Sequence, residues 1–159
     1  MSRLPTIKLR VVVADGDSFR ADDVAVPLNK IMMAYQNLND KWTTLLLDEG
    51  PDFTEKYAVM EFPETIFDQM KSVIKEHIKN NPAFYKKKSR CLLPAFYDFG
   101  DGVAMFYMNN IDLCYEIAKR HTRVVFRNGY SISVNGYPSQ IKSSASKVFQ
   151  EFQQYKETL

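Results

Sequence analysis

Apolar and polar side chains alternate along several short segments of the chain, a pattern typical of strands with one buried face. In residues 6–14, Ile7, Leu9, Val11 and Val13 fall on one face, whereas Lys8 and Arg10 fall on the other. Turn-forming sequences rich in aspartate and glycine, such as Asp15–Ser18, separate these segments. The pattern predicts further strands at 23–26, 43–48, 57–62, 123–127 and 130–134, and in the two arms of 90–110 around Asp98–Gly102.

Between these segments, apolar residues recur every three or four positions, which predicts helices. Three of the predicted helices begin at a proline that follows an apolar residue, at Val26-Pro27, Phe62-Pro63 and Tyr137-Pro138. Proline suits the first helical position because the N–H that it lacks has no partner there. The fourth predicted helix covers about 110–121, and the first extends from 27 to about 42.

The order of these elements predicts an α+β fold with antiparallel sheets, built from four β-β-α units whose helices pack on one face. The opposite face of the sheet would be open. The 159 residues fit a single compact domain of two pseudo-repeated halves, about 1–80 and 88–159, joined by a basic linker at 81–90. Asn128-Gly129 predicts a two-residue hairpin turn in the last unit.

Composition favours a globular protein of the cytoplasm. No segment has the layout of a signal peptide, and no apolar run approaches the length of a membrane span. The chain has two cysteines, Cys91 and Cys114, both in apolar surroundings. This pattern favours buried free thiols, and a single disulfide between them is the alternative. We therefore expect no membrane partner.

Positive charge is concentrated in one part of the chain. The net charge is only +2, yet residues 71–90 carry seven basic side chains and one acidic side chain. Basic side chains attract phosphates, and aromatic rings beside them can stack on unpaired bases. The segment 81–90 combines both kinds of residue: Phe84, Tyr85, Lys86, Lys87, Lys88 and Arg90. A solvated linker whose aromatic side chains enter the core is the alternative.

Three of the predicted strands add basic side chains to this candidate surface. Lys8 and Arg10 share a face of one strand, Lys88 and Arg90 share a face where another begins, and Arg123 and Arg127 share a face of the third, with Tyr130 just past its turn. If these strands belong to one sheet, its open face is basic and partly aromatic, as in sheet-based modules that bind single strands. A two-residue turn at Asn128-Gly129 would also place Ile132 and Val134 on the face of Arg123, so this face is not uniformly polar.

The layout of strands that lead into helices resembles Whirly/PUR-type domains. The resemblance covers most of the chain as a pattern and is carried by the junctions Val26-Pro27-Leu28 and Phe62-Pro63-Glu64 and by the basic, aromatic strands 90–97 and 123–130. It implies curved sheets that bind single-stranded DNA or RNA. It transfers no functional residue.

Catalytic motifs are weak. Asp98-Phe99-Gly100 stands without any other protein-kinase element, and neither histidine has a recognisable catalytic partner. We expect no enzyme activity, no cofactor and no metal site. The sequence predicts a nucleic-acid-binding protein for single-stranded RNA or DNA, with a homo-oligomer left open. The alternatives are a protein-interaction or assembly module, such as a viral accessory or structural subunit, and a hydrolase that uses its turn aspartates with a metal.

Overall fold

The computed structural model describes residues 4–50, 54–85 and 93–157, without the side chains of Phe84 and Tyr85. Its strands are β1 (Thr6–Asp15), β2 (Ser18–Pro27), β3 (Ile31–Gln36), β4 (Thr43–Asp48), β5 (Thr54–Val59), β6 (Ala95–Phe99), β7 (Gly102–Phe106), β8 (Ile111–Ala118), β9 (His121–Phe126) and β10 (Ser131–Asn135). The helices are α1 (Pro63–Asn80), α2 (Pro82–Tyr85) and α3 (Pro138–Glu157), with short 3-10 turns η1 (Leu28–Lys30) and η2 (Met108–Asn110).

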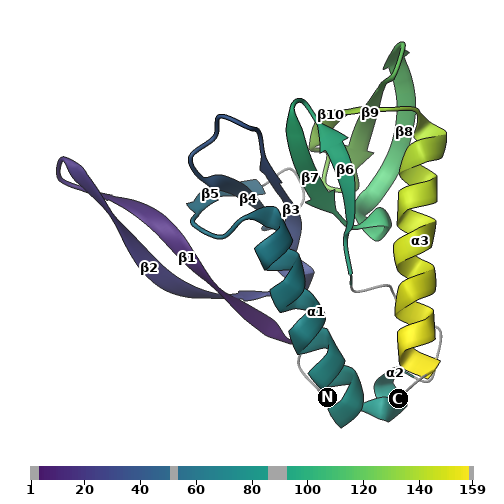
Figure 1. Cartoon of the computed structure of the whole chain (residues 1–159), viewed down its shortest axis with the longest axis horizontal. Coiled ribbons are helices and arrows are strands. Elements are labelled where there is room, and N and C mark those ends of the chain that lie inside the picture. Colours follow the sequence, from purple (N-terminus) through teal and green to yellow (C-terminus); the bar gives the residue numbers. More distant parts are fainter. Residues whose placement is uncertain (1–3, 51–53, 86–92, 158–159) are drawn as a thin grey trace.

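All strand pairs are antiparallel and form two sheets. Sheet A has seven strands in the order β2-β1-β5-β4-β3-β7-β6, and sheet B has three in the order β10-β9-β8. The long β1–β2 hairpin projects from the body, while α1 and α3 descend toward the end of the molecule where both chain termini lie (Figure 1). The fold is therefore α+β with antiparallel sheets, as the sequence predicts.

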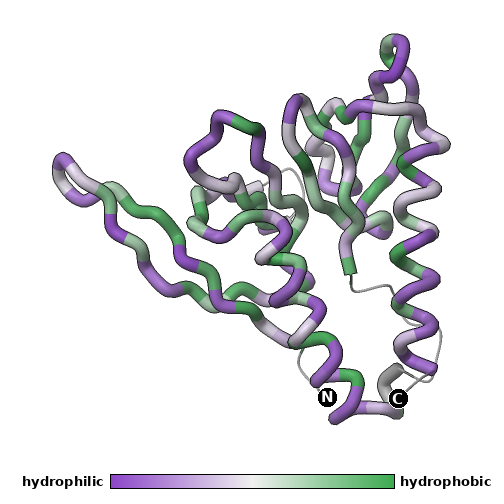
Figure 2. Tube along the Cα trace, in the orientation of Figure 1, coloured by the Kyte–Doolittle hydropathy of each residue, from purple (hydrophilic) through white to green (hydrophobic). Residues whose placement is uncertain are grey.

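Two apolar cores lie on opposite faces of sheet A. On one face, Ala34 and Leu45 pack with side chains of α1 such as Met70. On the other face, Met33 and Leu46 pack with sheet B and with Ile141 and Val148 of α3. The alternation of polar and apolar positions along β1 is visible in Figure 2. Sheet B therefore closes a face of sheet A that the sequence analysis left open.

Most predicted hairpins and two predicted helices are present. β4 has the predicted bounds, β6 and β7 flank the predicted Asp98–Gly102 turn, and α1 and α3 begin at Pro63 and Pro138. Gly102 is required where it stands, because a Cβ atom there would lie 1.9 Å from the backbone oxygen of Gln36. This close approach brings the β6–β7 hairpin against the end of β3.

Two predicted helices are wrong, and with them the division into four β-β-α units. The segment 27–42 forms η1, β3 and a loop, and 110–121 contains β8. In β3, Ile31 to Ala34 are all buried because β3 lies inside sheet A with cores on both faces. A strand covered on both faces shows a continuous apolar run, which local sequence does not distinguish from one side of a helix. Only two strand–proline–helix junctions remain.

The expected packing of the helices on one face also changes. The long helices do not both pack on one face of a single sheet, because α1 contributes to the first core alone, whereas α3 contributes Phe152 to the first core and Ile141 to the second. The division into a single domain of two halves is not tested by the fold and stays a prediction.

Candidate nucleic-acid interface

Lys8 and Arg10 lie on the exposed face of β1, as the alternation predicts. Arg10, however, is partly neutralised. Its backbone N–H donates to the carboxylate of Glu61, its guanidinium Nε lies 3.6 Å from the same carboxylate, and Asp23 stands opposite it in β2. Residues 6–27 carry three basic and four acidic side chains, so this hairpin has no excess of positive charge.

The predicted basic linker at 81–90 lies largely outside the described residues. Lys86, Lys87, Lys88 and Arg90 lie outside the described residues, as do the side chains of Phe84 and Tyr85, whose backbone belongs to α2. Their role in nucleic-acid binding stays a prediction.

The remaining predicted residues lie in or beside sheet B, so they do not share a sheet with Lys8 and Arg10. Arg123 lies on the outer face of β9, opposite Ser133, and its guanidinium donates to the hydroxyl of Ser131. Arg127 is exposed beyond the end of β9, where its Nε donates to the backbone oxygen of Asn109. Tyr130 is half-buried against Phe126, and burial raises the pKa of its phenol.

The register of the β9–β10 hairpin shows which side chains share the strand face of Arg123. Phe126 N–H donates to the oxygen of Tyr130, so four residues, 127–130, join the strands where the sequence predicts two. Ile132 then lies opposite Val124, and both are buried on the inner face. Arg123 therefore shares its face with serines, and the expectation that apolar Ile132 and Val134 lie beside it is wrong.

The turn between β8 and β9, Lys119-Arg120, holds the most unusual backbone. Arg120 has a φ of +61°, and among the described residues other than glycine it alone has a positive φ. Side chains with a Cβ atom rarely occupy this region, and such strain concentrates at functional sites. The conformation is held from outside the turn, because the N–H of Gly136 donates to the oxygen of Arg120 at 2.7 Å.

Loops from both halves of the chain meet beside this turn. The amide of Asn135 donates to the oxygen of Gly100, and the N–H of Leu38 donates to the carboxylate of Asp101. The buried hydroxyl of Thr122 donates to the oxygen of Gly136. These bonds tie the loops after β3, β6, β8 and β10 into one edge of the molecule, which is preorganised for contact.

A hollow of about 610 Å³ opens at this edge, and we call it the polar hollow. Arg120 lines it together with the amides of Asn135 and Gln140 and the aromatic ring of Tyr137. Asp98 contributes a carboxylate. The remaining lining residues are Phe96, Tyr97, Gly136, Ile141 and Ser144. Guanidinium, amide and aromatic groups around one space can hold a phosphate, the edge of a base and its flat face.

Positive charge around sheet B is not neutralised. Residues 111–135 carry four basic and two acidic side chains. Within the described part of the chain, the ion pairs involve Arg10, Arg20 and Lys30, and none involves Lys119, Arg120 or Arg123. Sequence reasoning selected Arg123 but missed Lys119, Arg120, Asn135, Tyr137 and Gln140. The Lys-Arg pair at a turn was the available signal, and it was hidden because this stretch was assigned to a helix.

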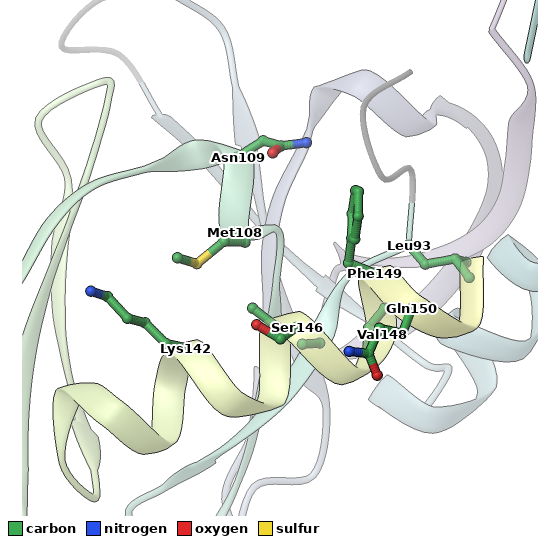
Figure 3. A pocket seen from close by; sticks show the side chains of 10 residues that line it. Leu93, Met108, Asn109, Lys142, Ser146, Val148, Phe149 and Gln150 are labelled. Atoms are coloured by element: carbon green, nitrogen blue, oxygen red, sulfur yellow. The ribbon is translucent and has the colours of Figure 1, made fainter. Parts of the chain in front are cut away.

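A second hollow of about 500 Å³ lies along α3 and is mainly apolar. Met108, Val148 and Phe149 line it, and Lys142 stands at one end (Figure 3). The described residues that line it include no carboxylate, histidine or cysteine, so it offers no acid–base pair. Elsewhere in the described residues, no group of three or more histidine, cysteine, aspartate or glutamate side chains could hold a metal ion.

No protein-family model and no curated protein sequence matches the chain. Among solved structures, the chain is similar to a LytTr DNA-binding domain from Bacillus cereus. The two chains are 15% identical, the match covers 94% of this chain and 96% of the other, and the TM-score is 0.41. A similarity of this size supports no assignment of function. The comparisons do not show the resemblance to Whirly/PUR-type domains, which stays a prediction. None of the described helices is both long and apolar enough to cross a membrane.

Proposed function

We propose that this chain is a non-enzymatic nucleic-acid-binding protein, and that the polar hollow and the adjoining outer face of sheet B contact single-stranded RNA or DNA. The observation that carries the proposal is the cluster of unneutralised cations at one end of sheet B, beside a hollow lined by amide and aromatic groups.

Each part of the cluster has a matching part in a nucleotide. The guanidinium of Arg120 can bind a phosphate through two parallel hydrogen bonds, and Arg123 offers a second charge on the neighbouring sheet face. Gln140 Oε1 accepts the N–H of Tyr137, which leaves the Gln140 amide N–H₂ to donate to a base edge. The hollow falls within the ~300–1,000 Å³ typical of ligand sites.

The preference for single strands follows from the shape of the site. A base can enter the polar hollow only when it is unpaired and unstacked, and the ring of Tyr137 offers it a stacking surface. A duplex would place only its phosphates against the arginines.

Fluorescence anisotropy with labelled single-stranded RNA, single-stranded DNA and duplex DNA at two salt concentrations tests this proposal. We expect tighter binding to the single strands, weakened by salt as phosphates displace counterions. Arg120→Ala should weaken binding about threefold to tenfold, which corresponds to the ~1 kcal/mol of an exposed charge-assisted bond. Arg20→Ala removes the same charge from an ion-paired site and is the matched control.

Binding weaker than about 100 μM at low salt would overturn the proposal, because even non-specific binding is usually stronger. Equal losses in the two variants would show that only total charge matters and would remove the polar hollow from the site. Tighter binding to the duplex would contradict the preference for single strands.

A further inference from the structure

The two halves of the chain repeat the same succession of elements with the same register. η1 and η2 each end at an isoleucine that begins the next strand, Ile31 or Ile111. In both strands the pairing shifts after that isoleucine and resumes two residues later, at Met33 opposite Leu46 and at Leu113 opposite Val125. β3 therefore corresponds to β8, with equivalent residues 80 positions apart.

The preceding hairpins correspond in the same way. Val26 pairs with Ile7 at the base of β1–β2, and Phe106 pairs with Ala95 at the base of β6–β7. β2 is thus equivalent to β7, again 80 residues apart. The first half therefore contains β3 and β2, and the second half contains their respective equivalents, β8 and β7.

The duplication creates two equivalent pairs of strand edges, β3 with β7 and β8 with β2. Within the described residues, only β3 and β7 are joined to each other. β3 joins β7 through Met33 opposite Phe106, Ala34 opposite Met105 and Tyr35 opposite Ala104. The equivalent edges, β8 and β2, are each the terminal strand of their sheet. If β8 and β2 pair with the register of β3 and β7, Leu113 lies opposite Val26, Cys114 opposite Ala25 and Tyr115 opposite Val24.

The unused edges carry exposed apolar side chains. Leu113 is 48% exposed on the outer face of sheet B, whereas its equivalent Met33 is 0% exposed because sheet B covers that face of sheet A. Of the nine large apolar side chains that are exposed in the described residues, five lie on β2 or β8: Phe19, Val24, Leu113, Tyr115 and Ile117. Free edges are often protected by lysine, other charged side chains, an internal proline or a β-bulge. β8 contains no lysine or proline, and its protection is limited to Asp112, Glu116 and two irregularities in its pairing with β9.

We infer that the partner of these edges is a second copy of this chain, whose β2 pairs antiparallel with β8 and extends sheet B. The internal β3–β7 joint shows that strands of these two types fit together within this fold. One contact opposes the pairing, since Glu116 would face Asp23 of the second copy. Arg10, the neighbour of Asp23 in its own hairpin, reduces that repulsion only in part, because Glu61 already neutralises some of its charge.

A disulfide tests the register directly, because Cys114 already stands in β8. In a Cys91→Ser background, Ala25→Cys places the new thiol opposite Cys114 of a second copy, within the Cα separation that a disulfide requires. We expect a covalent dimer under mild oxidation. Ala21→Cys is the matched control, since it lies on the same strand about 13 Å from the predicted partner. No dimer from Ala25→Cys, or equal amounts from both variants, overturns the register.

Light scattering on the unmodified chain, free of nucleic acid, tests the association itself. We expect a dimer or larger assembly at about 100 μM protein, because a weak interface has a dissociation constant of about this size. Leu113→Lys should return the chain to a monomer, whereas Leu38→Lys, at an exposed loop position, should not. A monomeric wild type, or dissociation by both variants, overturns the inference. Neither result bears on nucleic-acid binding, which is measured separately.

Discussion

The backbone N–H of Arg10 donates to both carboxylate oxygens of Glu61, at 2.7 and 3.2 Å. Glu61 is only 6% exposed although it is charged, and it lies just after β5, where β1 meets the rest of sheet A. This carboxylate therefore anchors the projecting hairpin by satisfying a backbone donor that the ladder between β1 and β5 leaves unused.

Replacing Glu61 should destabilise the protein. Glu61→Ala removes the acceptor of a buried charge-assisted bond, for which we expect a loss of about 1.5–3 kcal/mol in the free energy of unfolding. Chemical denaturation measures it. Glu76→Ala, at an exposed position of α1, is the control. Equal stabilities of the two variants would contradict the anchoring role of Glu61.

Arg120→Gly should separate function from stability. Glycine adopts positive φ without strain, so removal of the Arg120 side chain should stabilise the turn by about 1 kcal/mol. The same change removes the phosphate-binding guanidinium, so nucleic-acid affinity should fall. Thermal unfolding and anisotropy measure the two effects. Lys119→Ala, which lowers charge without affecting φ, should weaken binding at unchanged stability. A less stable Arg120→Gly variant, or one with unchanged affinity, would refute this pairing of effects.

Asp98→Asn should strengthen nucleic-acid binding, because it removes the carboxylate from the polar hollow. We expect a gain of about twofold to fivefold at low salt that disappears at high salt, as screening predicts. Asp68→Asn on the exposed surface of α1 provides the comparison. Loss of affinity would instead mean that Asp98 accepts a hydrogen bond from the bound base.

Glu116→Lys should strengthen self-association, because it replaces the repulsion from Asp23 of the second copy with an attraction. Sedimentation velocity measures the shift, and Glu76→Lys controls for the change of net charge. Added salt should strengthen association of the wild type and weaken that of the variant. Salt responses of the same sign would argue against this contact.

Stability should fall at alkaline pH, partly through Tyr130. Burial raises the pKa of this phenol above its ordinary value of 10.0, so the folded state holds the proton more tightly than the unfolded state. The corresponding stabilisation is complete below pH 10 and is lost as the pH rises through the folded pKa. Tyr130→Phe should flatten this alkaline decline in the free energy of unfolding. An unchanged pH profile would exclude Tyr130 as its source.

Local sequence was sufficient for several elements. The alternation in β1, the acidic turn of β6–β7 and the prolines that open α1 and α3 are short-range signals, and each has its predicted position. The same reasoning failed in β3 and β8, where apolar residues recur on both faces. Their strand character depends on neighbours that come from elsewhere in the chain.

The candidate site shows the same division. The concentration of positive charge can be predicted without the fold, and so can Arg123, from its alternation within a strand. The fold, by contrast, places Lys8 and Arg10 in another sheet and brings the loops after four strands together around Arg120. The fold also leaves the edges of β2 and β8 free. Side-chain periodicity is local to a strand, whereas sheet order, face burial and the clustering of loops depend on pairing between distant parts of the chain.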